Sequence, residues 1–464
     1  HFPIWHQEIE DILVLKNNKG TEDNRVRKLD YSIQISKLFY ERFIKNAEIT
    51  LFSPNHVPDL YEAFGMPEFD SLYLKYEKDK SIPKQTIGAQ DLFQALLKER
   101  AETGRIYIMN LDHCNTHSSF KDKVYMSNLC QEITLPTTPV QHIDDKEGEI
   151  ALCILSAINL GLLTDMNELE ELCDLSVRAL DEIIDYQEYP VEAAKISAQS
   201  RRSLGIGYIG LAHYLAKNQV KYEDKKAWKL VDKITEAFQF YLLKASNNLA
   251  KEKTKCLWFE KTKYSDGILP IDTYKKELDE IVSRELTYDW EWLRKEIKEH
   301  GLRHSTLSAQ MPSESSSVVS NATNGVEPPR DYLSVKKSKK GPLKQIVPDY
   351  NRLKNYYTLL WDMKGNEGYI NIIAVMQKYF DQAISGNWSY NPENYKDGEV
   401  PLSVMAQDLL TTYKLGWKTA YYQNTYDAKS DVDEPVHPVG WHDGVEETPK
   451  ETKEDEEDCE ACTI

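Results

Sequence analysis

Long apolar runs are missing from this 464-residue sequence. No uninterrupted stretch is long enough to span a bilayer, so we expect no membrane partner. The first six residues, His1–His6, lack the basic and apolar regions of a secretory signal peptide. The sequence also starts without Met, from which we expect that an upstream segment has been removed or left out. With 41% hydrophobic and 28% charged residues, the composition is that of a soluble globular protein.

Cysteine is scarce for a chain of this length. Seven thiols are too few for a disulfide scaffold, and they favour a reducing compartment in which cysteines are kept for chemistry or packing. We therefore predict a cytoplasmic protein. The seven are Cys114, Cys130, Cys153, Cys173, Cys256, Cys459 and Cys462.

Basic charge is also in short supply, since the net charge is −18. Residues 431–464 contain 13 acidic residues against 2 lysines, a net of −11, which leaves −7 for the rest. A segment with so few aliphatic residues cannot bury enough surface to fold, so we predict a disordered acidic tail over 427–464. An acidic protein is a poor candidate for nucleic acid or anionic membranes, and neither is expected as a partner.

Internal repeats are absent, and the chain alternates helical patterns with short apolar runs. The apolar spacing and the Gly and Pro punctuation predict helices over 7–48, 91–104, 166–185, 222–250, 290–300, 366–385 and 402–416. They predict strands over 105–110 and 419–423, a polar loop over 110–122, and loops with helix caps over 305–340. This alternation indicates an α/β, barrel-like core followed by the tail.

The stretch Ser127–Glu132 places an amide, a thiol and a carboxylate at alternate positions, Asn128, Cys130 and Glu132. In an extended segment alternate side chains leave on the same side, so all three could face one pocket. A thiol for radical or redox work, a carboxylate that moves a proton and an amide that orients a substrate form a plausible catalytic set. The alternative is a half-buried strand whose cysteine is a small hydrophobe.

The other thiols differ in context. Cys153 lies in an apolar run, where a buried structural thiol is expected. Cys459 and Cys462 form a CxxC pair in the predicted tail, which favours exchange between dithiol and disulfide. The alternative is half of a zinc site, but it needs two more ligands, and only His437 and His442 are near.

Two further motifs leave alternatives open. Tyr421 and Tyr422 are adjacent, and strand neighbours point to opposite faces, so one core and one surface side chain are expected unless the site requires one-electron transfer. Met311–Ser317 has the composition of a loop that caps a helix. Its hydroxyls and backbone N–H groups could form a phosphate site or a plain N-cap.

Two patterns are not interpreted as sites. Gly205–Gly210 matches GxGxxG, but the polar stretch Ser200–Ser203 precedes it where a dinucleotide site needs an apolar strand. Asp112–His117 has metal-type residues without a second cluster at ligand spacing. We expect a polar loop that fixes nearby backbone there, and no metal site is predicted.

Together these motifs resemble one family, the large catalytic subunit of class I ribonucleoside-diphosphate reductase. The resemblance extends almost from His1 to Ile464 and corresponds to the C-terminal part of that subunit. It is carried by His1–His6, Asn128–Glu132, Arg201–Gly207, Met311–Ser316, Asn321–Arg330, Tyr421–Thr425 and the run from Trp290 through His304 to Pro312.

The resemblance implies a role for each residue of the central stretch. Cys130 would become a transient thiyl radical that abstracts the 3′ hydrogen of a ribonucleotide. Glu132 would take the proton of the 3′ hydroxyl, and Asn128 would hydrogen-bond the ribose. Leu129 and Gln131 would belong to the same substrate-binding stretch.

It also implies an electron and thiol route. Cys153 would be one half of the active-site dithiol that reduces C2′. Tyr421 and Tyr422 would be the last relays of a radical path from a small subunit, which supplies the one-electron requirement. Cys459 and Cys462 would re-reduce the active site and would themselves be reduced by thioredoxin or glutaredoxin.

The implied fold is a ten-stranded α/β barrel over residues 1–426, with Cys130 on a finger loop inside it and a redox tail over 427–464. A loop of five residues would hold the substrate diphosphate. These are Pro312, Ser313, Glu314, Ser315 and Ser316.

The chain departs from the family in three respects. The second cysteine of the active-site dithiol belongs to an earlier barrel strand, and no unassigned cysteine here has a matching context. The regions that bind ATP and other allosteric effectors are also mostly upstream. The tail spacing, CxxC, is tighter than the CxxxxC of close relatives. We therefore predict the second piece of a split or truncated subunit, active only with an N-terminal fragment.

The implied partners are that fragment, a small diiron-tyrosyl subunit and a ribonucleoside diphosphate, and no cofactor is expected in this chain itself. One alternative is a catalytically idle fragment that only binds reductase subunits. Another is a cobalamin-dependent ribonucleotide reductase, which would not need Tyr421 and Tyr422. A glycyl-radical enzyme is disfavoured because no glycine-radical motif lies near the C-terminus.

Overall fold

The computed structural model describes residues 1–17, 25–26, 28–338 and 341–427. The helices are α1 (Ile9–Leu13), α2 (Lys37–Ile44), α3 (Pro58–Ala63), α4 (Phe69–Lys78), α5 (Ala89–Thr103), α6 (Leu111–Thr116), α7 (Glu168–Tyr186), α8 (Glu192–Arg201), α9 (Leu211–Lys217), α10 (Lys225–Glu252), α11 (Pro270–Thr273), α12 (Trp290–His300), α13 (Glu314–Val319), α14 (Tyr350–Leu353), α15 (Glu367–Gln377) and α16 (Leu402–Lys414). Short 3-10 helices are η2 (Leu160–Leu162), η3 (Phe259–Lys261), η4 (Lys263–Asp266), η5 (Lys276–Glu280), η6 (Leu360–Asp362), η7 (Pro392–Asn394) and η8 (Lys396–Gly398).

The strands are β1 (Phe2–Pro3), β2 (Tyr31–Ile35), β3 (Glu48–Leu51), β4 (Gln85–Gly88), β5 (Ile106–Asn110), β6 (Leu155–Asn159), β7 (Gly205–Ile209), β8 (Leu333–Ser338), β9 (Gly341–Ile346), β10 (Trp388–Tyr390), β11 (Thr419–Ala420) and β12 (Gln423–Thr425). The predicted tail, with both of its cysteines (Cys459 and Cys462) and its two histidines, lies outside the described residues. The boundary at 426/427 stays a prediction.

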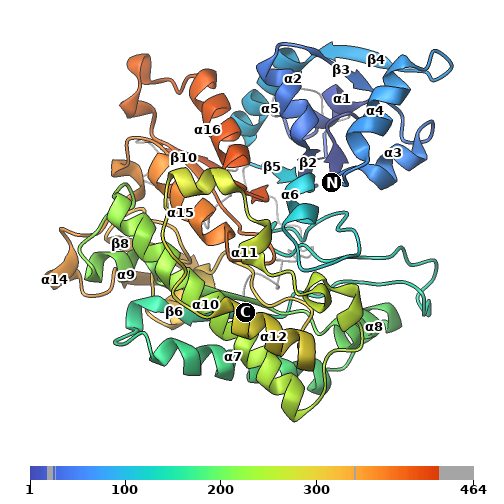
Figure 1. Ribbon diagram of the computed structural model, residues 1–464. Coiled ribbons are helices and arrows are strands. Elements are labelled where there is room, and N and C mark those ends of the chain that lie inside the picture. Colours follow the sequence, from blue (N-terminus) through green and yellow to red (C-terminus); the bar gives the residue numbers. More distant parts are fainter. Residues whose placement is uncertain (18–24, 27, 339–340, 428–464) are drawn as a thin grey trace.

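Extended segments lie side by side in one open array that runs through the centre of the molecule (Figure 1). β1, β2 and β5 are parallel neighbours, and β11 pairs antiparallel with β5. β12 follows β11 and pairs parallel with β10. Just before β10, Ile384 forms a parallel bridge with Gln310. Ser308 in turn bridges Ile206 of β7, which pairs parallel with β6.

The array therefore has two halves of opposite direction. The first consists of β1, β2 and β5, and the second of the segments around 419–425, 384–390, 307–310, β7 and β6. β1 and β6 are its two edges among the described residues. The α/β class is confirmed, whereas the described strands do not close into a barrel.

Helices cover the array and bury apolar faces against it. The 28-residue α10 packs beside α7, and α12 lies along α10 (Figure 1). At the other half, α5 packs against β5 and α16. No helix in the described ranges combines the length and the apolar character needed to cross a membrane.

Helices with clear punctuation match their predictions. α5 ends at Gly104, whose φ of 70° is the left-handed conformation that glycine adopts without a Cβ penalty. α12 covers Trp290–His300 and also ends at a glycine, Gly301. α7, α10 and α16 lie within a few residues of the predicted ranges, and β5 matches the strand predicted over 105–110.

Other assignments were wrong. Residues 7–48, predicted to be largely helical, form a strand over Tyr31–Ile35 (β2), which is buried on both faces, and they end where β3 (Glu48–Leu51) begins. A fully buried strand shows no alternation, so its apolar residues also fit a helical spacing. The polar loop over 110–122 contains α6, and the helix predicted to reach 385 ends at Gln377.

The GxGxxG pattern lies largely in a strand. Gly205 and Gly207 belong to β7 and are not part of a turn between a strand and a helix. A Cβ on Gly207 would lie 2.7 Å from the carbonyl oxygen of Ala309, so close packing of neighbouring segments requires glycine there. The motif therefore serves strand packing.

A buried carboxylate on α7 gathers several cations. The side chain of Asp181 is fully buried. Its oxygens accept hydrogen bonds from Arg202 (2.6 Å), Lys253 (2.9 Å), Arg303 (3.1 Å) and His304 (3.2 Å). Burial alone would raise the pKa of Asp181, but these donors hold it well below its usual range. The cluster joins α7 to the end of α10 and to the segment after α12.

We expect Asp181→Asn to lower the free energy of unfolding by about 3–5 kcal/mol, because it leaves buried cations without their counter-charge. Since the pKa of Asp181 is lowered by folding, the carboxylate stabilises the protein at neutral pH. That contribution is lost as the pH falls below about 4, where the unfolded chain takes up the proton. Urea unfolding of both proteins at pH 7 and in acid measures the difference.

Asp174→Asn is the matched control on the same helix. Asp174 pairs with Arg178 at the surface, so its loss should cost less than about 1 kcal/mol. Equal losses for the two variants would contradict the buried-charge explanation.

Candidate active site

The stretch Ser127–Glu132 is a loop with a turn at its tip. Gln131 has a φ of 72°, in the left-handed region, and its N–H donates to the carbonyl oxygen of Asn128 at 3.2 Å. The expectation of an extended segment with Asn128, Cys130 and Glu132 on one face is therefore wrong.

Asn128 closes this loop. Its N–H donates to the carbonyl oxygen of Ile133 (3.2 Å), and its Oδ1 accepts from the N–H of Ile133 (3.1 Å). Leu129 at the tip is 40% exposed, whereas Cys130 and Glu132 are buried, at 4% and 2%. The loop thus presents one apolar side chain outward and holds the thiol and the carboxylate inside.

The thiol lies in a buried cluster with two tyrosines. Cys130, Tyr107 of β5 and Tyr421 pack together apart from the main core, and Tyr422 packs against them. Tyr421 Oη lies 3.6 Å from Cys130 Sγ and 3.0 Å from Tyr422 Oη. The rings of Tyr421 and Tyr422 are 3.9 Å apart between centroids. A continuous line of polar contacts therefore leads from Tyr422 through Tyr421 to Cys130.

Strand geometry predicts that the two tyrosines point to opposite faces, but in the structure they lie on the same side. They lie in the gap between β11, which ends at Ala420, and β12, which begins at Gln423, so the strand alternation does not apply. Burial raises the pKa of both phenols above its ordinary value, with the larger effect on Tyr421. At neutral pH both hydroxyls therefore keep their protons.

The backbone of the tyrosine pair is fixed from two sides. On one side, Gly386 O accepts from the N–H of Tyr421 (2.8 Å), and Asn387 Oδ1 accepts from the N–H of Tyr422 (2.9 Å). On the other side, the buried Arg100 of α5 donates to the carbonyl oxygens of Tyr421 (2.9 Å) and Tyr422 (3.3 Å). No sequence signal marked Arg100, since an arginine in an amphipathic helix is ordinarily a surface residue.

The carboxyl group of Glu327 is connected to the tyrosine pair through Asn387. Asn387 Nδ2 donates to Glu327, so one amide links Glu327 to the backbone of Tyr422. Burial raises the pKa of Glu327 to about 7, against the opposing effects of Arg330 and Asn387. Sequence reasoning missed its unusual environment, because the partner Asn387 is 60 residues away.

Pro312 and Ser313 precede α13, whereas Glu314, Ser315 and Ser316 form its first turn, so the predicted loop is partly helical. Ser313 donates its hydroxyl to Met311 O (3.3 Å) and its N–H to Asn324 Oδ1 (3.1 Å), and its side chain makes no capping hydrogen bond with α13. Ser313 therefore occupies the N-cap position of α13, as one alternative predicted, but without a side-chain capping hydrogen bond. The loop continues directly from the array segment 307–310, which neighbours the segment that holds the tyrosine pair.

Cys153 is exposed, so the buried structural thiol expected at this position is wrong. It lies just before β6 (Leu155–Asn159), the edge strand of the array. A chain that paired with this edge would pass close to the thiol.

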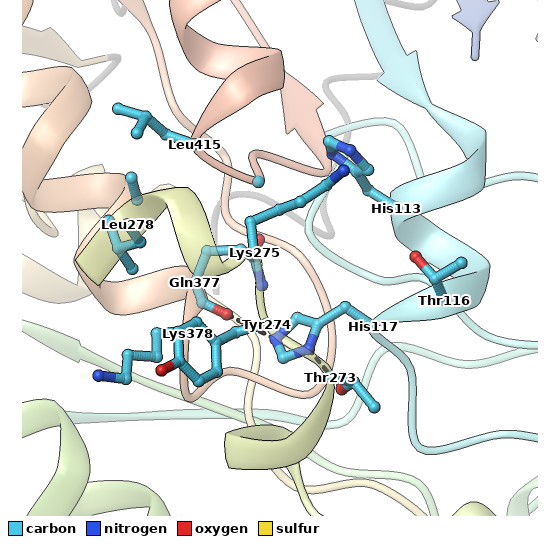
Figure 2. A pocket seen from close by; sticks show the side chains of 12 residues that line it. His113, Thr116, His117, Thr273, Tyr274, Lys275, Leu278, Gln377, Lys378 and Leu415 are labelled. Atoms are coloured by element: carbon cyan, nitrogen blue, oxygen red, sulfur yellow. Dashed lines mark hydrogen bonds between the residues drawn. The ribbon is translucent and has the colours of Figure 1, made fainter. Parts of the chain in front are cut away.

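The stretch Asp112–His117 fixes backbone as expected, although most of it is helical. His113 Nδ1 lies 2.9 Å from Trp417 O, and His117 bonds Thr273 Oγ1 (2.8 Å) and Gln377 O (2.7 Å). In Figure 2, His117 points toward Thr273 at a small hollow that both residues line. None of the candidate active-site residues lines this hollow.

In the described ranges one group of side chains has metal-ligand spacing. It consists of Glu296, Glu299 and His300 on α12, and two of the three are exposed. It lies outside the candidate active site and outside the Asp112–His117 stretch, where no such group is found among the described residues.

Comparison with known proteins identifies the class. The family model described as "Ribonucleotide reductase, barrel domain" matches residues 1–423. The chain therefore belongs to the ribonucleotide reductase barrel-domain family, and the resemblance to the large subunit is confirmed.

Particular relatives agree. The chain is 58% identical over 441 residues to the ribonucleoside-diphosphate reductase subunit alpha of Haemophilus influenzae, covering 94% of the chain and 58% of that protein. It is 56% identical to subunit alpha of reductase 1 of Escherichia coli (96% and 59% covered) and 43% identical to subunit alpha of phage T4 (100% and 60% covered). The chain thus spans 58–60% of the length of these relatives.

We expect iodoacetamide to modify Cys153 in the native chain well before three buried thiols. Burial raises the pKa of Cys114 and Cys256 to about 12 and that of Cys173 further, so their reactive thiolates are scarce. Peptide mapping of a chain whose two tail cysteines are replaced by serine, before and after unfolding in urea, measures the order. Modification of Cys153 only after unfolding would contradict its exposure.

Proposed function

We propose that this chain is the catalytic-subunit portion of a ribonucleoside-diphosphate reductase, converting ribonucleoside diphosphates to 2′-deoxyribonucleoside diphosphates for DNA synthesis. The names of the three relatives and the family match support this proposal. The single observation that carries it is the line of contacts from Tyr422 through Tyr421 to Cys130.

This line suits a one-electron relay that ends in a thiyl radical. When a neutral tyrosyl radical forms at Tyr421, it takes a hydrogen atom from Cys130: the S–H bond breaks, the phenol O–H bond forms, and the radical moves to sulfur. Because Tyr421 Oη lies 3.6 Å from the sulfur, this transfer requires little movement. Tyr422, at 3.0 Å, would regenerate the radical on Tyr421 in the same way.

The remaining roles follow the family resemblance. Cys130 abstracts the 3′ hydrogen, Glu132 takes the proton of the 3′ hydroxyl, and Asn128 bonds the ribose. The neighbouring Leu129 and Gln131 complete the sugar-binding loop.

The substrate diphosphate is held by the loop Pro312–Ser316, in agreement with its position at the end of the array segment 307–310. The 2′ hydroxyl leaves as water, and Cys153 with a second cysteine supplies two electrons and closes to a disulfide.

The open array supports a barrel completed by another polypeptide. The first half has three extended segments and the second has five, so two further strands beside β1 and β6 would make a ten-stranded barrel with equal halves. We propose that the N-terminal portion of the subunit supplies them. A cysteine on a strand added beside β6 would lie close to Cys153, where the second thiol of the active-site pair is required.

Further partners follow from the same reading. A small diiron-tyrosyl subunit delivers the radical to Tyr422, with no cofactor held by this chain. Cys459 and Cys462 form the tail pair that re-reduces the active site and is reduced by thioredoxin or glutaredoxin. The enzyme works in the cytoplasm, and allosteric control by nucleotides such as ATP acts mostly through regions outside this chain.

Two alternatives remain distinguishable. An idle fragment that only binds reductase subunits would have no use for the ordered contacts between Tyr422, Tyr421 and Cys130. A cobalamin-dependent reductase would generate its thiyl radical directly, without a tyrosine pair. The contacts of Tyr421 on both sides therefore favour the class I enzyme.

Reduction of CDP tests the proposal. The chain is assayed alone, then with an N-terminal fragment of a related alpha subunit, and then with the small subunit added. Turnover only in the full mixture supports a reductase whose active site is completed across chains. Binding without turnover in every mixture would support the idle fragment.

We expect Tyr421→Phe, Cys130→Ser and Glu132→Ala each to reduce turnover of the assembled enzyme to background with any reductant. The first removes the hydroxyl between Cys130 and Tyr422, and the others remove the reacting thiol and the carboxylate. Tyr426→Phe, outside the contact line, should keep turnover within about twofold, as expected for a substitution away from the reacting groups. Full activity of Tyr421→Phe would exclude the relay.

The tail pair has a test that depends on the reductant. We expect Cys459→Ser to abolish turnover with thioredoxin and to leave activity with dithiothreitol, because a small dithiol reaches the active site without the tail. Rates of CDP reduction with each reductant measure this. A variant as active as the wild type with thioredoxin would show that the tail carries no electrons.

A further inference from the structure

One short segment, 383–388, contacts both halves of the candidate active site. Its later part holds the backbone of the tyrosine pair, through Gly386 and Asn387. Its earlier part holds the loop Ser127–Glu132, because the N–H of Ala383 donates to Glu132 O at 3.0 Å. The hydroxyl of Ser385 hydrogen-bonds the carbonyl oxygen of Cys130 and lies 3.0 Å from Glu132 Oε2.

Ser385 is itself firmly placed. It is 7% exposed, and its N–H donates to Gln310 O at 2.9 Å, next to the bridge between Ile384 and Gln310. The position of its hydroxyl is therefore set by the array and not by the loop Ser127–Glu132. Its hydroxyl contacts both Cys130 and Glu132.

Hydrogen-bond arithmetic makes this placement depend on the proton of Glu132. A serine hydroxyl has one proton to donate, whereas a carbonyl oxygen and an ionised carboxylate are both acceptors only. While Glu132 is ionised, the two oxygens therefore compete for the proton of Ser385. Once Glu132 is protonated, its O–H can donate to Ser385 Oγ, and Ser385 can donate to Cys130 O, so both contacts are satisfied at once.

We propose that Ser385 is a positioning residue that couples the proton on Glu132 to the placement of Cys130. The inference rests on the proposed function, in which Glu132 takes a proton from substrate in each cycle. With Glu132 ionised, Ser385 stabilises the base before the reaction. With Glu132 protonated, the hydroxyl turns fully to the carbonyl of Cys130 and holds the thiol while the radical resides on the substrate.

Titratable groups reach this contact from several parts of the chain. The finger contributes Cys130 and Glu132, β5 contributes Tyr107, and the pair after β11 contributes Tyr421 and Tyr422. Burial raises the pKa of all three phenols, so they stay neutral. On the segment itself, Gly386 and Asn387 carry no charge, and Glu327 is reached only through Asn387.

The first test measures the proton directly on the 464-residue chain. Infrared difference spectra between each protein and its Glu132→Gln version isolate the carboxyl band of Glu132 as the pH is varied. Ser385→Ala removes two hydrogen bonds from the protonated form of the site and one from the ionised form, so the midpoint should move down by about one pH unit. Ser385→Thr keeps the hydroxyl and should titrate within about 0.3 unit of the wild type, a difference well below the loss of one charged hydrogen bond.

The second test uses the assembled enzyme. Ser385→Ala should lower kcat for CDP reduction by about tenfold or more, the effect of one lost hydrogen bond to a charged group, and leave KM within about twofold. The acid limb of its pH–rate profile should move to lower pH, because a smaller share of Glu132 is protonated at a given pH. The control is Ser389→Ala on β10, whose hydroxyl contacts Asn424.

The outcomes separate cleanly. Equal infrared midpoints for wild type and Ser385→Ala, or equal shifts for the Ala and Thr variants, would overturn the coupling. An unchanged acid limb with a raised KM would overturn it as well, since that points to substrate binding alone. If the wild-type assembly reduces no CDP, the proposed function fails, and the infrared midpoints still decide whether Ser385 sets the proton affinity of Glu132.

Discussion

The carboxylate of Asp381 fixes the chain just before the segment 383–388, which contacts both halves of the candidate active site. It is 3% exposed and accepts hydrogen bonds from the N–H groups of Leu307 (2.9 Å) and Ser308 (2.8 Å). The buried Lys418 donates to the carbonyl oxygen of Asp381 at 2.8 Å. Because Lys418 directly precedes β11, one turn ties the array segment 307–310 to the strand that leads into the tyrosine pair. Burial lowers the pKa of Lys418 to about 7, and its hydrogen bonds to backbone carbonyls take the place of a counter-ion.

After Asp381 the chain runs through the segment 383–388, and the candidate active-site residues contact it in order. Cys130 and Glu132 contact its beginning, and the backbone of Tyr421 and Tyr422 contacts its end. All four are held mainly by backbone hydrogen bonds and short polar side chains, which lose little conformational freedom on folding. The burial of Cys130 and Tyr421 keeps water from the line of contacts, which suits an intermediate that must not react with solvent.

The sequence singled out candidate residues that the structure brings together, but it did not predict their geometry. The alternate spacing of Asn128, Cys130 and Glu132 suggested one face of a strand. In the structure the left-handed conformation of Gln131 bends the chain there, and the side chain of Ser385 holds the loop Ser127–Glu132. Ser385 is 255 residues from Cys130, and no local pattern reports such a contact. Local signals worked where local physics decides, as at Gly104 after α5. They failed over 31–35, where burial on both faces hides the strand period.

The edges of the array have a consequence for how such a chain can exist in a cell. β6 is an edge among the described residues, half-buried and only five residues long, and the edge at β1 is shorter still. Edge strands offer rows of N–H and C=O groups that recruit other strands, including those of identical chains. A polypeptide with two such edges can add strands at either side, so its net charge of −18, which makes identical chains repel one another, opposes association at these edges.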